Sequence, residues 1–541
     1  MRKKIPGCGR SLFAAALLTL GAGCASTDVS LTLSRDAHSS NLKVVYRFSD
    51  PVDVLSFETD AGPIRSYWTP LTDGVEMRGD TAASTRGPID QMRFAIRPDE
   101  RQFDRVNPGV YVLGGGAVVN IAYLLPDSAR FDHELRVVAP GATLVTDHVQ
   151  TRLDATPAVV TDRTGFAYVG PDAAVHPDRN VVIVAPDAIA APVLDVVSTL
   201  FSSAADYYAG FAEPPPLPPR IYLALDDTDS PDRAYRGTVL GNALAVYLTG
   251  DWLRTNLDAG QQRAGIGRFI RHETFHFFQG VHHSPNDDQH RSAWLWEGSA
   301  EYFAARLGAV EDADAQPTVE ELGRDCLTAL LDEPLVRDGT GHMGDAPYAC
   351  GHFLVATAAL LSEVPDGAIA AIWGAMLDPS GLHGSAWTTD EFFDVAETHG
   401  AGAELTRIAN LIIDTPGLER WDHVTAMLRR SVPGIDISLP PEVLAAGEAF
   451  DLVFQLVTSH CSGASGFWNH GDSITLDASD CSGGLIDRAE VTGVESHPFG
   501  EPTAWLDTFK ARCAAGEAIR FQLRDGSEMP VPCSPHRIEH P

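Results

Sequence analysis

Two histidines and a glutamate in the run His272-Glu273-Thr274-Phe275-His276 have the residue types and the spacing of a zinc site. On a helix, residues four apart lie on one face, so His272 and His276 can direct two imidazoles at one metal ion. Glu273 lies beside them, where a carboxylate can take a proton from an activated water. The run therefore predicts metal-assisted hydrolysis with Glu273 as the general base.

Two histidines leave such a site incomplete, because a catalytic zinc takes three protein ligands and keeps a fourth position open. A downstream segment, WLWEGSAEYF at residues 294–303, supplies a candidate. This segment resembles the second metal helix of the gluzincin metallopeptidases, in which the glutamate of a Glu-Gly pair binds zinc. The resemblance implies that Glu297 is the third ligand, and twenty residues separate it from His276.

The same resemblance implies roles for two more residues. Glu301 lies one turn after Glu297, where gluzincins keep a carboxylate that accepts the free ring N–H of the first histidine. The segment APYACG at residues 346–351 resembles their Pro-Tyr-x-x-Gly segment, so Tyr348 is expected to donate a hydrogen bond to the oxyanion. Ala349 and Cys350 depart from the charged residues that relatives often carry there.

Taken together, these residues predict a zinc metallopeptidase that acts on peptides or proteins without a covalent intermediate. His272, His276 and Glu297 would hold the zinc, Glu273 would move the proton, and Tyr348 would stabilise the oxyanion. The alternative is a catalytically inactive surface lipoprotein that uses the peptidase fold as a binding module. The presence of the proton-transferring glutamate favours the enzyme.

The choice between cleavage at chain ends and cleavage within chains stays open. The chain resembles most closely the glycyl-aminopeptidase and leukotriene-hydrolase families, whose aminopeptidases carry a glutamate for the substrate amine on a strand before the metal helix. The corresponding stretch, LGNALAV at residues 240–246, has no glutamate. This difference disfavours a strict aminopeptidase.

A sheet and two helices must position these residues. Helical periodicity over residues 265–280 and 294–307 predicts the two metal helices. A proline-rich run at 213–219 acts as a stiff spacer before them. The other expected elements are strands at 181–184, 221–225 and 243–248, and helices at 193–211, 353–361, 368–376 and 405–413. An α/β unit followed by helices is what the resemblance to thermolysin-like catalytic domains implies.

The whole chain is too long for one hydrophobic core, and changes in its sequence pattern predict several domains. Residues 29–178 carry short alternating runs that predict an all-β domain. Residues 179–439 form the expected catalytic domain. Residues 440–541 return to short strands and turns, and two glycine-flanked runs in them resemble the second half of a PDZ domain. Residues 24–28 are expected to be a tether.

Residues 1–23 have the pattern of an export signal peptide, with basic residues, a short apolar run and small residues before Cys24. The tripeptide before Cys24 resembles a bacterial lipobox, which implies lipidation of this cysteine; simple cleavage nearby is the alternative. Either outcome predicts an exported protein, as a cell-envelope lipoprotein or in secreted form. The only membrane attachment that we expect is this lipid anchor.

Cysteine use agrees with export to an oxidising compartment. Six cysteines follow Cys24, an even number that predicts disulfides. Two lie in the expected catalytic domain and four near the end, so one bridge plus two bridges is the simplest partition, with three possible pairings among the last four. The six are Cys326, Cys350, Cys461, Cys481, Cys513 and Cys533.

The charge balance excludes one class of partner. Lysine and arginine number 40 against 73 acidic residues, a formal net charge of −33. Such an acidic surface repels a phosphate backbone, so we expect no nucleic-acid partner. Solubility is the simplest reason for the charge.

Overall fold

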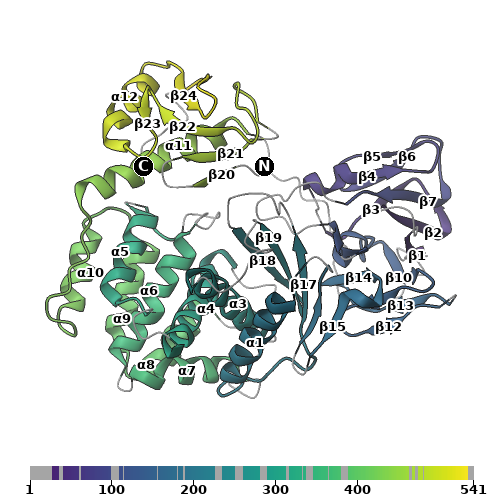
Figure 1. The fold of residues 1–541 in the computed structure, drawn as a ribbon, viewed down its shortest axis with the longest axis horizontal. Helices are drawn as coiled ribbons and strands as arrows, with labels where there is room; N and C mark the ends of the chain where they lie inside the picture. The colour runs from purple at the N-terminus through teal and green to yellow at the C-terminus, as the bar shows by residue number, and fades with distance from the viewer. Residues whose placement is uncertain are drawn as a thin grey trace, which may run out of the picture.

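The structure is a computed structural model of the 541-residue chain, and its colour runs from purple β strands through teal and green helices to a yellow C-terminal part (Figure 1). The predicted signal peptide and Cys24 lie outside the described residues. The structure describes residues 27–35, 41–59, 62–98, 109–113, 115–154, 156–178, 181–186, 189, 191–225, 234–249, 260–280, 289–311, 316–331, 333–336, 345–362, 365–378, 388–461, 466–469, 473–478 and 481–533.

The first part of the chain is built from β strands. β1 (Thr27–Arg35) lies inside a six-stranded sheet, parallel to β10 (Phe131–Val138) and antiparallel to β2 (Leu42–Val52). Burial alternates along β1, as a strand with one face on a core requires. The other strands here are β3 (Val54–Ser56), β4 (Trp68–Pro70), β5 (Val75–Met77), β6 (Thr81–Ser84), β7 (Ile89–Ile96), β8 (Val110–Leu113), β9 (Gly116–Asn120), β11 (Thr143–Val145), β12 (Gln150–Arg152), β13 (Ala158–Val160) and β14 (Phe166–Gly170).

A mixed sheet follows and supports the metal helices. Its order is β15-β16-β17-β19-β18, in which β16, β17 and β19 are parallel and β15 and β18 pair antiparallel at the edges. α1 (Ala191–Tyr208) connects β16 to β17 as a crossover helix. The strands are β15 (Val175–Pro177), β16 (Val182–Val184), β17 (Arg220–Leu225), β18 (Ala234–Leu240) and β19 (Ala243–Thr249). The sequence predicted all of these except β15 and β18.

This sheet shares a core with the β14-containing sheet of the first part. Tyr222 of β17 packs on Phe166 of β14 with ring centroids 6.2 Å apart. Its buried hydroxyl lies 3.3 Å from the carbonyl oxygens of both Val145 and Phe166. The two parts are therefore joined by apolar packing and by hydrogen bonds, not by a linker alone.

A helical layer covers the mixed sheet and holds the largest core. α3 (Gly260–Gly280) and α4 (Gln289–Glu311) lie at its centre in Figure 1, and α4 packs against α6 (Ala346–Leu361). The remaining helices of this layer are α5 (Val319–Leu330), α7 (Pro365–Met376), α8 (Thr389–Thr398), α9 (Gly402–Ile413) and α10 (Arg420–Leu428).

The C-terminal part has more helix than the sequence predicted. α11 (Pro441–Ser459) and α12 (Pro502–Ala514) pack with a sheet of order β20-β21-β22-β24-β25. Both helices carry proline in the first turn, where a missing N–H costs nothing, so these prolines begin helices and do not exclude them. The strands are β20 (Gly466–Asn469), β21 (Ile474–Asp477), β22 (Glu490–Val494), β23 (His497–Pro498), β24 (Ile519–Leu523) and β25 (Glu528–Val531).

Three disulfides join the six downstream cysteines. Cys326 pairs with Cys350 between α5 and α6, and the last four pair as Cys461–Cys481 and Cys513–Cys533. One of the three open pairings is thereby selected, and the disulfides indicate a compartment outside the reducing cytoplasm. Among the described residues, no helix combines the length and apolarity needed to cross a bilayer.

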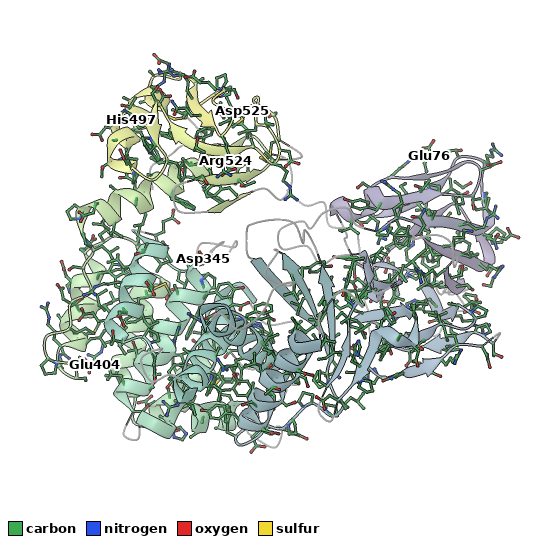
Figure 2. The ribbon with its side chains drawn as sticks, in the orientation of Figure 1. Glu76, Asp345, Glu404, His497, Arg524 and Asp525 are labelled. Atoms are coloured by element: carbon green, nitrogen blue, oxygen red, sulfur yellow. A yellow bond between two sulfur atoms is a disulfide. The ribbon has the colours of Figure 1, made fainter. Side chains whose placement is uncertain are left out.

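Acidic side chains are spread over the whole molecule. Figure 2 labels Glu76 on the first β part, Asp345 at the beginning of α6, Glu404 on the helical layer and Asp525 on the C-terminal part. Acidic side chains are thus present on each of the three parts.

Candidate metal centre

Helix α3 brings its two histidines to one buried face. His272 and His276 are 6% and 5% exposed. Between them in the sequence, Phe275 packs on Tyr208 of α1 and on Phe303 of α4, with ring centroids 5.1 and 4.7 Å away. The aromatic packing fixes the rotation of α3 about its axis, and so directs both imidazoles toward α4.

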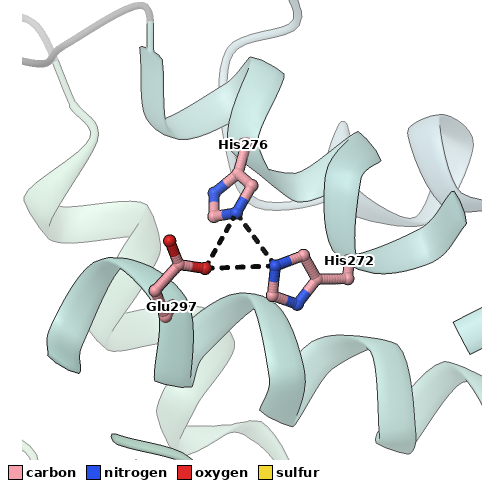
Figure 3. A group of neighbouring side chains, drawn as sticks. All are labelled: His272, His276 and Glu297. Carbon is pink, nitrogen blue, oxygen red and sulfur yellow. Dashed lines mark hydrogen bonds and ion pairs between the residues drawn. The ribbon is translucent and has the colours of Figure 1, made fainter. Parts of the chain in front are cut away.

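Helix α4 supplies Glu297, which forms a triad with His272 and His276. Nε2 of His272 lies 3.0 Å from Nε2 of His276, and Oε2 of Glu297 lies 3.2 and 3.3 Å from these two nitrogens (Figure 3). Ligand distances of about 2.0–2.1 Å in tetrahedral zinc sites place the ligand atoms about 3.3 Å from one another. The triangle of side-chain atoms therefore has the size that one zinc ion requires.

The chemistry of the three atoms also suits a cation. Oε2 of Glu297 is buried, and no described residue gives it a well-directed hydrogen bond. A buried acceptor without a donor is costly, and an ion between the three atoms would remove that cost. Two imidazoles with one carboxylate are a common zinc ligand set, so the residues fit the predicted metal.

The charged groups around the triad shift the pKa values of its side chains. Burial acts to lower the pKa of His272, but the nearby carboxylates of Glu297 and Glu301 raise this pKa to about 10. Burial acts to raise the pKa of Glu297, but the nearby His276 and His272 lower it to about 2. The side chains thus hold positive and negative charge at close range, as a site that exchanges protons for a metal ion does.

Glu301 lies behind His272, where the gluzincin resemblance implied a carboxylate. Its Oε1 is 3.0 Å from Nδ1 of His272. Its Oε2 accepts a hydrogen bond from Nε of Arg268 at 2.8 Å and a second one from Nη2 of the same guanidinium. Burial opposes ionisation of Glu301, but His272 and Arg268 bring its pKa down to about 2. This carboxylate can orient the imidazole and favour the tautomer with a free Nε2.

Glu273 is buried beside the triad but is not one of its three convergent groups. Burial raises the pKa of its carboxyl, and the neighbouring His272 and His276 oppose that shift. A raised pKa makes the carboxylate a better proton acceptor near neutral pH. The carboxyl group of Glu273 is therefore held beside the triad with an increased affinity for a proton.

Tyr348 lies in the first turn of α6 and faces His272. The two rings stack with centroids 5.8 Å apart and an interplanar angle of 23°, and the tyrosine is 39% exposed. The disulfide at Cys350 ties this turn to α5. Tyr348 therefore lies beside the triad with part of its side chain exposed to solvent.

The strand beside the metal helix differs from the one expected. Residues 240–246 comprise the end of β18, a two-residue turn and most of β19, which lies inside the sheet. The edge strand β18 instead approaches α3 at Gly237, where a Cβ would lie 2.5 Å from the ring of Phe269 and 3.2 Å from Oε1 of Glu273. β18 carries no acidic residue, so the lack of a glutamate holds for the observed strand as well.

Sequence reasoning missed two residues next to the site, Gly237 and Gln279. Gln279 is fully buried on α3, three positions after His276, and a polar residue at that spacing on the metal-facing stripe could have been noticed. No local sequence pattern identifies Gly237, because its role comes from a long-range contact between β18 and α3.

No family profile matches the chain, and no curated protein matches it. Among solved structures, an aminopeptidase A from Legionella pneumophila in complex with aspartic acid is 13% identical, with a TM-score of 0.42, over 72% of this chain and 49% of its own. A mutant M1 zinc metallopeptidase from Deinococcus radiodurans is 16% identical, with a TM-score of 0.41, over 77% of this chain and 95% of its own. The chain thus spans about half the length of the Legionella protein.

Proposed function

We propose that this chain is an exported zinc metallopeptidase of the gluzincin type that hydrolyses peptide bonds. The observation that carries the proposal is the convergence of Nε2 of His272, Nε2 of His276 and Oε2 of Glu297 within 3.0 to 3.3 Å. These three residues would hold the ion. When bound, a zinc ion in such a site supplies Lewis acidity, polarising a carbonyl and making a water more acidic.

The other residues provide proton transfer and charge stabilisation. Glu273 takes a proton from the attacking water and passes it to the leaving amine, which its burial and raised pKa support. Tyr348 donates a hydrogen bond to the carbonyl oxygen as negative charge develops there. Glu301 holds His272 in position through Nδ1.

The proposed setting is outside the cytoplasm. The three disulfides support it, and a lipid on Cys24 would keep the enzyme at the cell envelope. The proposed substrates are peptides or proteins. Because β18 carries no carboxylate to pair with a free α-amino group, peptides with acetylated N termini should also be cleaved.

Glu273→Gln tests the proposal, because it removes the base and keeps the shape of the side chain. Zinc content should stay at one per chain, and hydrolysis of a quenched fluorescent peptide library, with free and acetylated N termini, should be lost. Glu397→Gln, at an exposed position of α8, is the matched control and should cleave like wild type. Zinc binding by a wild-type protein that cleaves no peptide would favour the binding module, and undiminished cleavage by Glu273→Gln would refute the assigned mechanism.

A further inference from the structure

Gln279, in the last turn of α3, connects one metal-site histidine to the second metal helix. Its side chain is fully buried. Oε1 lies 2.7 Å from Nδ1 of His276, and Nε2 donates to the backbone carbonyl of Trp296 at 3.1 Å. The side-chain amide of Gln279 thus accepts a hydrogen bond from a residue of α3 and donates one to a residue of α4.

The direction of these bonds is set by the backbone carbonyl. The oxygen of Trp296 can only accept, so it must face the NH2 group of Gln279. The amide oxygen is then left facing Nδ1 of His276, which must carry a hydrogen to donate. A neutral imidazole protonated at Nδ1 has its lone pair on Nε2, the atom that points to Glu297 and His272.

Trp296 contacts the same imidazole a second time. Its ring stacks on His276 with centroids 4.8 Å apart and an interplanar angle of 8°. The next residue in the chain is Glu297, the third group of the triad. The indole fixes the plane of His276, while the Trp296 carbonyl, through Gln279, fixes its rotation and its tautomer.

The two histidines are therefore held in different ways. His272 faces Glu301, a carboxylate paired with Arg268, whereas His276 faces a neutral amide. A glutamate at position 279 could accept from Nδ1, but its ionised carboxylate would face the Trp296 carbonyl oxygen with no hydrogen to donate. The site thus requires an amide at this position.

We propose that Gln279 is a positioning residue for the metal centre. By linking His276 to the Trp296 carbonyl, Gln279 holds this histidine with its Nε2 free to bind a cation. The inference rests on the proposed function only in that zinc is taken as the ligand of the triad. Loss of this contact should weaken zinc binding even where the fold is intact, because the imidazole can then rotate or change tautomer.

The test measures zinc affinity, not turnover alone. Gln279→Met keeps the length of the side chain and removes the amide. Its zinc dissociation constant, from competition with a chromophoric chelator, should rise about 10–100-fold. The d–d absorption of the Co²⁺-loaded variant should change as well, since a misplaced imidazole alters the coordination geometry. Thr274→Val, which removes another fully buried hydrogen-bonding group on α3, is the matched control and should leave both readouts unchanged.

Gln279→Glu tests the hydrogen bond to the Trp296 carbonyl separately from the one with His276. It should also bind zinc more weakly than wild type, and wild-type affinity in this variant would overturn the role of the Trp296 carbonyl. Wild-type affinity in Gln279→Met would overturn the inference as a whole while leaving the proposed function intact. Zinc binding without hydrolysis in wild type would refute only the proposed peptidase activity. A wild-type protein that binds no zinc would overturn both the proposed function and the role of Gln279.

Discussion

Gly298 of α4 and Gly351 of α6 are in backbone contact. A Cβ on Gly298 would lie 2.0 Å from the carbonyl carbon of Gly351, and a Cβ on Gly351 would lie 2.0 Å from the carbonyl oxygen of Trp294. Only glycine permits this approach. Because Glu297 precedes one glycine and Tyr348 lies one turn before the other, the contact brings a triad residue and the proposed oxyanion donor together.

Gly351→Ala should therefore separate the two helices. The added methyl group meets backbone on α4, which cannot move aside as a side chain can, so we expect a loss of about 3 kcal/mol or more in the free energy of unfolding. Urea denaturation measures it. Gly367→Ala on α7 is the control, since no atom lies within 4 Å of its Cβ position, and it should gain up to about 1 kcal/mol. Equal stability of the two variants would contradict the packing argument.

Removal of either a histidine or the glutamate of the triad should abolish metal binding. Wild type should contain one zinc per chain by elemental analysis, and His272→Ala and Glu297→Ala should contain none, because two ligands do not hold a catalytic zinc. Treatment with a strong chelator should remove the metal from wild type, and added zinc should restore activity. Retention of zinc by Glu297→Ala would show that another residue is the third ligand.

Gly237→Ala should disturb the base without disturbing the metal. Its methyl group would press on Phe269 and come 3.2 Å from Oε1 of Glu273. We expect kcat to fall about 10–100-fold, because small displacements of a catalytic group are costly, while zinc content stays at one per chain. Unchanged kcat would mean that β18 does not constrain Glu273.

The disulfide between Cys326 and Cys350 should stabilise the turn that carries Tyr348. The two cysteines are 24 positions apart, and loss of a bridge of this length costs about 3 kcal/mol. The double alanine variant should therefore unfold more easily and lose activity before it unfolds. The matched control is the double alanine variant of Cys461 and Cys481, 20 positions apart, which should weaken the C-terminal part and keep catalysis. Equal activity losses in both variants would argue against a specific effect on Tyr348.

Asp147 should make stability depend on pH at the junction of the β part and the mixed sheet. It is 4% exposed, its Oδ2 accepts the Asn242 N–H at 2.8 Å, and burial raises its pKa from 3.8 to about 6. The folded state therefore holds this proton more tightly than the unfolded chain. Its contribution to the free energy of unfolding is largest below about pH 4 and falls by about 3 kcal/mol as the pH rises through 6.

Asp147→Asn should lose this dependence, because an amide does not ionise. The difference in unfolding free energy between variant and wild type should shift in favour of the variant by about 3 kcal/mol between pH 4 and pH 7, as measured by denaturation at each pH. Asp73→Asn, at an exposed position, is the control. A constant difference across this range would show that Asp147 is not the titrating group.

The sequence alone was sufficient for the parts of the site that depend on local spacing. His272 and His276 share a helical face because they are four residues apart. The helices α3 and α4 begin and end within five residues of the expected positions. Resemblance to gluzincins pointed to Glu297, Glu301 and Tyr348, and the structure brings all three to the triad. The cysteine count gave the number of bridges but left the last pairing open.

Only the tertiary structure decided which distant segments meet. The edge strand β18 beside Glu273, the backbone contact of Gly298 with Gly351, and the link from His276 through Gln279 to Trp296 all join residues on different elements. Such contacts arise from packing of whole elements, which no periodicity within one element encodes. The helices α11 and α12 were not predicted for a related reason: proline is compatible both with the end of one element and with the first turn of a helix, and packing of the apolar face selects the helix.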